Sequence, residues 1–122
     1  MLRLTALLLT AVVLAACQRP GVDARSAVPG ADPHRGKQLI AQIGCGKCHM
    51  VPGVTGADGL VGPPLQAFGR RTVIAGFFPN TPDNLVHWIQ APQRFLPGNA
   101  MPNMEINDHD ARDVAAYLYS LR

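Results

Sequence analysis

The sequence predicts a small all-α domain, with three or more short helices joined by long Gly/Pro loops. Three stretches of the 122-residue chain combine a helix-start signal with apolar residues three and four positions apart, and no stretch has the length and alternation of a strand. The 12 glycines and 11 prolines favour loops between these helices. Only seven residues are aromatic, and much of the apolar fraction lies in the first sixteen residues. Side chains alone would give a small core, so we expect something else to fill the middle of the fold.

The first predicted helix follows an N-cap at Asp32 and begins with Pro33, a residue that suits the first helical position. It ends at Gly44, directly before a pair of cysteines. The apolar residues on one side of it are Leu39, Ile40 and Ile43.

The second and third predicted helices carry similar signals. Thr81 caps the second, Pro82 starts it and Pro92 stops it, whereas Asn107 caps the third. Asp108 and Asp110 lie in the first turn of the third helix, where negative charge is favourable. The apolar positions are Leu85, Trp88 and Ile89 in the second helix, and Val114, Tyr117, Leu118 and Leu121 in the third.

The N-terminal segment, residues 1–16, is typical of an export signal. It has one positive charge at Arg3 and then an apolar run too short to span a bilayer comfortably. The run ends in "LAAC", Leu14 to Cys17, which resembles the lipobox of bacterial lipoproteins. This predicts cleavage before Cys17, a lipid on that cysteine and a location on the periplasmic side of a bacterial membrane. The alternative is an ordinary secretory signal in which Cys17 is incidental.

Residues 17–31 are expected to form a lipidated, flexible tether, because Pro and Gly punctuate this stretch and no apolar periodicity is present. The folded domain is then expected over residues 32–122. Loss of residues 1–16 removes one arginine, which leaves ten basic and eight acidic residues and a net charge of +2. These charges are scattered rather than concentrated in a stripe, so nucleic acid is not an expected partner.

The motif "CGKCH", Cys45 to His49, fits three chemistries that differ in the residues they require. A thiol-disulfide enzyme uses the two thiols beside a βαβ pattern, which this sequence lacks, and a structural zinc site needs paired groups of ligands that it does not offer. Haem attachment uses all three residues: Cys45 and Cys48 form thioether bonds to the vinyl groups, and His49 binds the iron. The histidine, together with the export signal, favours one covalently attached haem c.

Further motifs extend the match from residue 33 to residue 122. They are "GPPL" at 62–65, "FGRR" at 68–71, "PGNAMP" at 97–102 and "AAYLYSL" near the end, in that order. With "CGKCH", this order resembles the small His/Met class of c-type cytochromes, particularly the haem domain fused to subunit II of some bacterial terminal oxidases. The resemblance implies a small cytochrome c fold, with the first and last helices packed together beside the haem.

The resemblance also implies roles for three residues around the haem. The carbonyl of Pro63 would accept a hydrogen bond from the second ring nitrogen of His49 and so orient the imidazole. Arg70 would pair with a haem propionate, the alternative being a solvated surface arginine. Trp88 stands where many relatives have a tyrosine whose hydroxyl touches the distal ligand, and an indole offers only a donor there.

The distal iron ligand implied by the resemblance is Met101, the methionine of "GNAMP". A thioether raises the potential relative to a second histidine and keeps both oxidation states six-coordinate. Met104 is the rival ligand, and core packing is the alternative role for either methionine. Met50, next to His49, is expected on the wrong face of the haem.

The resulting interpretation is a monomeric electron carrier, not an enzyme, that shuttles single electrons between membrane-associated redox proteins, with a terminal oxidase as a candidate partner. Two alternatives remain: an accessory haem subunit held in an oxidase or dehydrogenase complex, and a haem enzyme or gas sensor with an open sixth position. Three further histidines are expected on the surface rather than at the iron: His34, His87 and His109.

Overall fold

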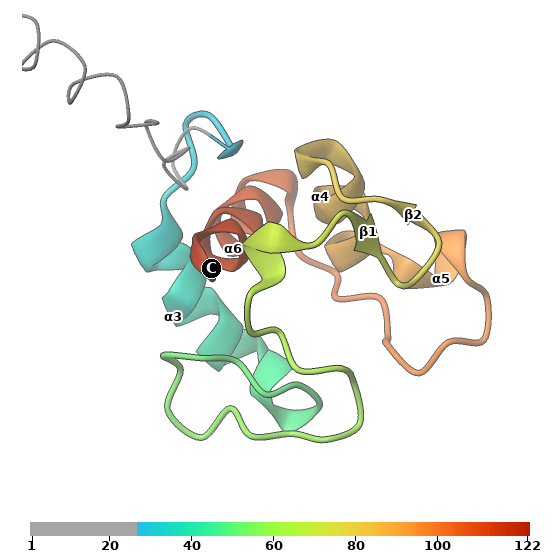
Figure 1. Cartoon of the computed structure of the whole chain (residues 1–122), viewed down its shortest axis with the longest axis horizontal. Helices are drawn as coiled ribbons and strands as arrows, with labels where there is room; N and C mark the ends of the chain where they lie inside the picture. The colour runs from blue at the N-terminus through green and yellow to red at the C-terminus, as the bar shows by residue number, and fades with distance from the viewer. Residues whose placement is uncertain (1–26) are drawn as a thin grey trace, which may run out of the picture.

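The structure is a computed structural model that describes residues 27–122. The predicted signal peptide, Cys17 and most of the predicted tether therefore lie outside the described residues. The elements, in chain order, are α3 (Pro33–Ile43), η2 (Cys45–Lys47), η3 (Phe68–Arg70), β1 (Val73–Ile74), β2 (Phe78–Pro79), α4 (Pro82–Gln90), α5 (Pro92–Phe95) and α6 (Asp108–Ser120). The predicted all-α class, with long loops between short helices, is confirmed (Figure 1).

The three predicted helices correspond to α3, α4 and α6, and each begins where its cap predicts. In all three, the N-cap side chain accepts a hydrogen bond from a backbone N–H in the first turn. The donors and distances are His34 to Asp32 (2.8 Å), Asn84 to Thr81 (3.3 Å) and Asp110 to Asn107 (2.8 Å). Helix α3 ends at Gly44, whose φ of 88° lies in the left-handed region that glycine adopts without strain.

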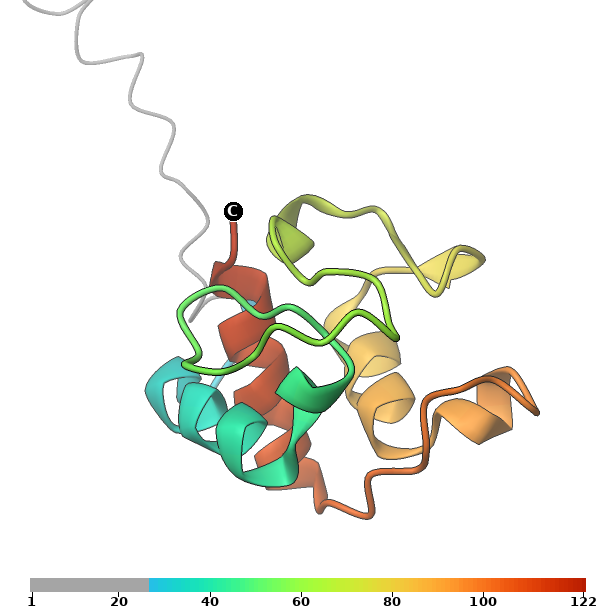
Figure 2. The same ribbon diagram turned by 90° about the horizontal axis from the view of Figure 1, so that it is seen from below.

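Helix α6 is the centre of the fold and lies between α3 and α4 (Figure 2). Because it packs on more than one side, it buries more than the predicted stripe that contains Val114 and Leu118. Its buried residues are Ala111, Asp113, Val114, Ala115, Ala116, Leu118 and Tyr119. Small residues let the helices approach closely: a Cβ on Gly36 of α3 would lie 1.9 Å from the backbone oxygen of Asp113.

A polar cluster fastens the start of α3 to α6. Asp113 is 1% exposed and accepts hydrogen bonds from the backbone N–H of Asp32, at 2.7 Å, and from the Arg35 guanidinium. Arg35 also pairs with Asp110, and this contact lowers the pKa of that carboxyl below its usual value. The ring of His109 completes the cluster, with Nδ1 at 2.9 Å from Arg35. The buried carboxylate is therefore fully paired.

The β1–β2 hairpin was not predicted. Val73 pairs with Pro79 and Ile74 with Phe78, and strands of two residues are too short to show an alternating pattern. The single turns η2, η3 and α5 escaped prediction for the same reason, since three or four residues carry no helical periodicity.

The packed part of the chain begins earlier than the predicted boundary at Asp32. Val28 is completely buried, and Ala27 and Ala31 pack against the same core. A single valine between small residues and Pro/Gly has no periodicity, so the sequence offered no sign of this contact. Residues 27–31 thus belong to the folded domain rather than to a free tether.

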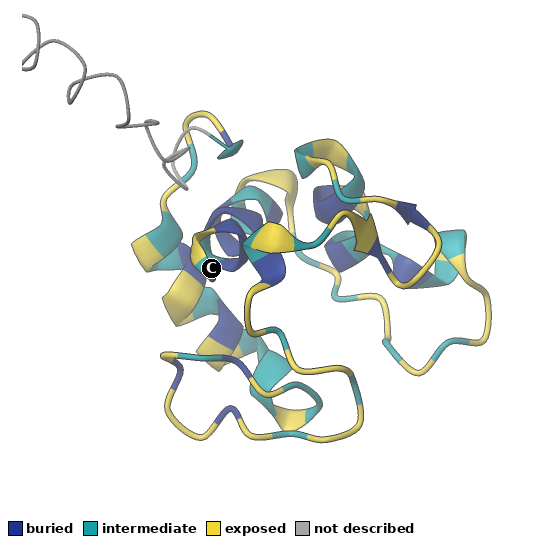
Figure 3. Cartoon of the chain, in the orientation of Figure 1, coloured by how far each residue is buried: buried dark blue, intermediate teal, exposed yellow. Residues whose placement is uncertain are grey.

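Two long loops, around residues 50–65 and 96–106, lie toward the lower side of the molecule in Figure 1. Burial is concentrated in the helices; the 96–106 loop alternates between exposed and partly buried residues, whereas the 50–65 loop buries Val51, Val54 and Ala57 (Figure 3). Within residues 27–122, no helix is long and apolar enough to cross a membrane.

Candidate haem-binding site

The two thiols of the "CGKCH" motif are presented by a tight turn at the end of α3. The backbone carbonyl of Cys45 accepts hydrogen bonds from the N–H groups of Cys48, at 3.2 Å, and His49, at 2.9 Å. Both cysteines are free and partly buried, and burial raises the pKa of Cys45. The turn therefore holds two unpaired thiols and an imidazole on one short segment.

The imidazole of His49 is oriented by the loop that carries Pro63. Its Nδ1 lies 2.7 Å from the carbonyl oxygen of Pro63, which can only accept, so Nδ1 carries the proton. Nε2 makes no hydrogen bond with any residue of the stretch 27–122 and is the nitrogen available to a metal. The predicted contact between Pro63 and His49 is present, although the resemblance alone had suggested it.

Gly62 allows the Pro63 loop to approach the histidine ring. A Cβ at this position would lie 2.2 Å from Cε1 of His49 and 2.6 Å from Nδ1. Two backbone hydrogen bonds of 2.8 Å, from Gly62 to Cys48 and from Leu65 to Met50, fix the loop against the motif. The glycine is thus a steric requirement of the histidine position.

Helix α6 supports the motif from the other side through a tyrosine. The hydroxyl of Tyr117 donates a 2.6 Å hydrogen bond to the carbonyl of Pro52, in the loop after His49, and burial raises the pKa of this tyrosine. The sequence had predicted only a packing role for Tyr117, because helical spacing does not reveal what a hydroxyl contacts.

The two adjacent arginines of "FGRR" differ in their surroundings. Arg70 is exposed, and its guanidinium has no partner among residues 27–122, so its pairing with a propionate stays a prediction. Arg71 donates to the carbonyls of Pro64 and Gln66 and lies 5.3 Å from the centre of the Phe68 ring. The sequence missed this role of Arg71, since neighbouring arginines look alike without the fold.

Trp88 lies in an aromatic cluster on α4, α5 and β2. Its ring centre is 5.5 Å from that of Phe78 and 6.2 Å from that of Phe95, and the two phenylalanines stack at 5.0 Å. The indole N–H forms no hydrogen bond with residues 27–122. Trp88 is partly buried, and its contact with haem stays a prediction.

Met101 and Met104 are both partly buried in the loop before α6, but their backbones are held differently. The N–H of Met101 donates to the Asn99 side chain at 2.8 Å, and its carbonyl accepts from the Gln93 side chain at 2.8 Å. Met104 instead donates its N–H to the backbone carbonyl of Gln90 at 3.1 Å. Met50, the residue directly after the "CGKCH" motif, is 40% exposed.

Comparison with known proteins identifies the family. The family model described as cytochrome c matches residues 33–122. The chain belongs to the cytochrome c family. The predicted resemblance to the haem domain of oxidase subunit II is also confirmed. Cytochrome c oxidase subunit 2 of Alkalihalophilus pseudofirmus is 38% identical over 90 residues, and that of Bacillus subtilis is 29% identical over 92 residues.

These matches cover most of this cytochrome but only part of its relatives. They take in 73% and 72% of this chain, and 25% and 26% of the two oxidase subunits. The chain therefore spans about a quarter of the length of these relatives, the quarter that carries their cytochrome c sequence.

Membership of the cytochrome c family implies a haem c and its iron, and the donor set of this cytochrome fits that group. Two free thiols flank a turn, and an imidazole with the Pro63 carbonyl as acceptor on Nδ1 follows directly. Leu60 and Val61, next to Gly62, are 86% and 70% exposed, as apolar residues beside a large planar apolar group would be. Among residues 27–122, no cluster of three or more His, Cys, Asp or Glu side chains suggests a different metal site.

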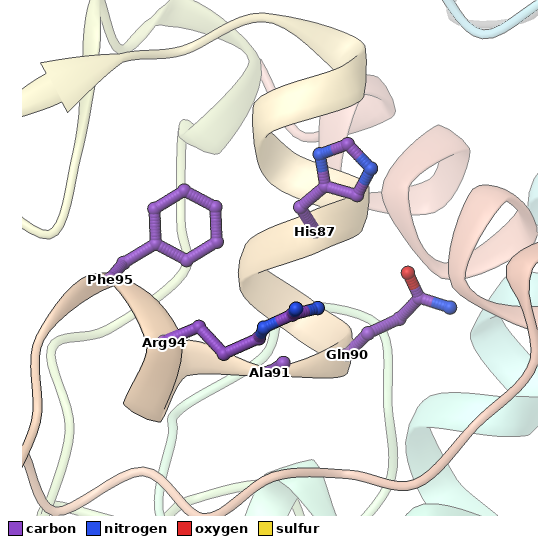
Figure 4. Close-up of a pocket in the computed structure, with 5 residues that line it drawn as sticks. All are labelled: His87, Gln90, Ala91, Arg94 and Phe95. Atoms are coloured by element: carbon purple, nitrogen blue, oxygen red, sulfur yellow. The ribbon is translucent and has the colours of Figure 1, made fainter.

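The cytochrome also has an open hollow of about 410 Å³ between α4 and α5 (Figure 4). Its lining residues are His87, Gln90, Ala91, Arg94 and Phe95. None of them is a predicted haem ligand, and neither the two thiols nor His49 line the hollow. The three histidines expected on the surface, His34, His87 and His109, are all exposed.

Proposed function

We propose that this cytochrome is a single-electron carrier with one haem c, attached through Cys45 and Cys48 and ligated by His49 and Met101. The observation that carries the proposal is the 2.7 Å contact between His49 Nδ1 and the Pro63 carbonyl, beside two unpaired thiols. When bound, the haem iron supplies a centre that exchanges one electron at a time with small structural change.

The protein's own residues account for the stability of such a site. The Pro63 carbonyl fixes the tautomer of His49 and makes its Nε2 a stronger donor. Tyr117 anchors the loop after the motif to α6, and the amide side chains of Gln93 and Asn99 hold the segment with Met101. A rigid set of ligands suits electron transfer, because little reorganisation accompanies the change of charge.

The proposed setting is the periplasmic side of a bacterial membrane, with a lipid on Cys17 as anchor and a redox protein as partner. The "LAAC" sequence supports the anchor. The two relatives are named as subunits of cytochrome c oxidase, which supports a terminal oxidase as electron acceptor. The same two relatives also support the alternative of a permanent accessory subunit, because the cytochrome c sequence of each relative is part of an oxidase subunit. A haem enzyme or gas sensor is the less favoured alternative, since Met101 would fill the sixth position.

Fractionation of the native host distinguishes a shuttle from a permanent subunit. A shuttle anchored through Cys17 stays in the membrane pellet after a high-salt wash but does not copurify with an oxidase in detergent. The variant Cys17→Ser should then appear in the soluble fraction, still red and still reducible. Copurification of the wild type with an oxidase at high salt would favour the accessory-subunit alternative. A soluble wild-type protein with a different N-terminus would overturn the anchor.

A further inference from the structure

One side chain, Gln93 in α5, makes three hydrogen bonds to the loop that carries Met101. Its Nε2 donates to the backbone carbonyls of Asn99, at 2.9 Å, and Met101, at 2.8 Å. Its Oε1 accepts from the backbone N–H of Gly98 at 2.9 Å. The side-chain amide thus bonds to three residues, Gly98, Asn99 and Met101, within one short stretch of the loop.

The orientation of this amide follows from its partners. A backbone N–H can only donate, so the atom facing Gly98 must be the oxygen, and backbone carbonyls can only accept, so the atom facing Asn99 and Met101 must be the nitrogen. If the amide were reversed, its oxygen would face two carbonyl oxygens and its NH₂ group would face the N–H of Gly98, so none of the three hydrogen bonds could form. The three bonds therefore define one conformation of the loop.

Met101 is held on both sides of its α-carbon. Gln93 binds its carbonyl, and the side chain of Asn99 accepts from its N–H at 2.8 Å. The loop is also tied to α5 elsewhere, because Asn103 accepts from the backbone N–H of Gln93 at 3.4 Å. Gly98, with a φ of 81°, supplies the sharp turn that brings residues 99–101 back toward Gln93. The other methionine, Met104, has no side-chain amide on its backbone within residues 27–122.

We propose that Gln93 is a positioning residue that holds Met101 ready to act as the sixth iron ligand. The inference rests on the proposed function, in which Met101 binds the iron. A thioether is a weak, neutral ligand, and a base or water replaces it whenever the loop swings away. The Gln93 clamp raises the free energy of that swing, so it sets how readily the ligand is lost.

The test is a pH titration of the ferric holoprotein. The measured quantity is the midpoint pH at which the sulfur-to-iron absorption band is lost as the pH is raised. Gln93→Leu removes all three hydrogen bonds and leaves a side chain of similar size to glutamine. We expect the population of the open loop to rise about a hundredfold, which moves the midpoint of band loss about two pH units lower. Gln90→Leu is the matched control, because Gln90 donates only one bond, of 3.2 Å, to the Ile106 carbonyl. The midpoint of band loss in Gln90→Leu should equal that of the wild type.

A second variant gives a signature that simple destabilisation would not. Gln93→Glu keeps an acceptor for Gly98 but places a carboxylate against two carbonyl oxygens. Protonation of that carboxyl near its usual pKa of about 4.3 restores one donor. The variant should therefore bind carbon monoxide more readily than the wild type at pH 7, and this difference should shrink on acidification to pH 4.

The failures of the two proposals differ. If the wild type lacks the sulfur band, or if Met104→Ala rather than Met101→Ala abolishes it, the ligand assignment fails. If the band is present and Gln93→Leu has the same midpoint as Gln90→Leu, the clamp is refuted. Should Gln93→Leu not fold, proton exchange of the Gln93 amide in the wild type decides: slow exchange of both Nε2 protons supports the clamp, and exchange as fast as that of an exposed glutamine overturns it.

Discussion

Replacement of Gly62 by alanine should displace the proximal histidine. The added Cβ would lie 2.2 Å from Cε1 of His49, whereas ordinary contact begins at 3.4 Å. The two must therefore separate by roughly 1.2 Å. The loop is fixed on both sides of the new methyl group, by Gly62 to Cys48 and by Leu65 to Met50, so the ring yields rather than the backbone.

The size of the effect follows from this displacement. A shift of that length takes Nδ1 from 2.7 Å to beyond hydrogen-bond distance of the Pro63 carbonyl. Overpacking costs about 1–3 kcal/mol, and the lost hydrogen bond about 0.5–1.5 kcal/mol. The Gly62→Ala protein should thus be less stable by about 2–4 kcal/mol, which lowers the Tm of a domain of this size by roughly 10 °C or more. The reduction potential should rise, because His49 without its acceptor is a weaker donor to ferric iron.

Thermal unfolding and a redox titration of the holoprotein measure both effects. Gly69→Ala is the matched control: its Cβ would lie 2.3 Å from the backbone oxygen of Tyr119, so it should lose stability but keep the wild-type potential. Gly76→Ala adds a methyl group in open space, at a φ of 82°, and should cost only about 1–2 kcal/mol. The steric requirement at Gly62 is refuted if the Gly62→Ala protein has the wild-type reduction potential and a free energy of unfolding within about 0.5 kcal/mol of the wild-type value.

Three further predictions concern the helices and the loop that carries Met101. Gly36→Ala should destabilise the fold by about 2–3 kcal/mol in urea denaturation, despite the better helix propensity of alanine, because its Cβ would lie 1.9 Å from the backbone oxygen of Asp113; equal or higher stability would contradict this. Burial raises the pKa of Tyr119 to about 12, above its unfolded value of 10.0, so its contribution to stability should be complete below pH 10 and lost as pH rises through 12. Alkaline unfolding together with an absorbance titration of tyrosinate checks this, and Tyr119→Phe should remove that part of the pH dependence; an unchanged profile would count against it. Met101→Ala should abolish the sulfur-to-iron band and lower the potential, whereas Met104→Ala should keep both; a reversed result in the ferric spectrum would move the ligand to Met104.

The three main helices could be predicted because their signals are local. Asp32, Thr81 and Asn107 each bond to a backbone N–H within three residues, so the sequence contains both partners of the cap. The turn at Gly44 follows from the same short-range rules. The "CGKCH" motif likewise places its chemistry within five residues.

The contacts that the sequence did not reveal either join residues far apart or depend on how a loop folds back on its neighbours. Tyr117 reaches Pro52 and Val28 enters the core, and neither contact leaves a periodic pattern. Gln93 was missed because a single glutamine in a one-turn helix looks like a surface residue until the loop folds back on it. Arg71 was missed because only the fold separates its surroundings from those of Arg70.

In the proposed function, Cys45, Cys48 and His49 form the attachment site of one covalent haem. Denaturing electrophoresis of the holoprotein, followed by peroxidase staining and mass spectrometry of the peptide around residues 45–49, tests this attachment. We expect a stained band that persists after boiling in detergent, and a peptide whose mass is increased by one haem bound to both cysteines. In the variant Cys45→Ser with Cys48→Ser, the stain should disappear. A wild-type protein that releases its haem on denaturation, or a peptide with two unmodified thiols, would show that the haem is not attached through these cysteines.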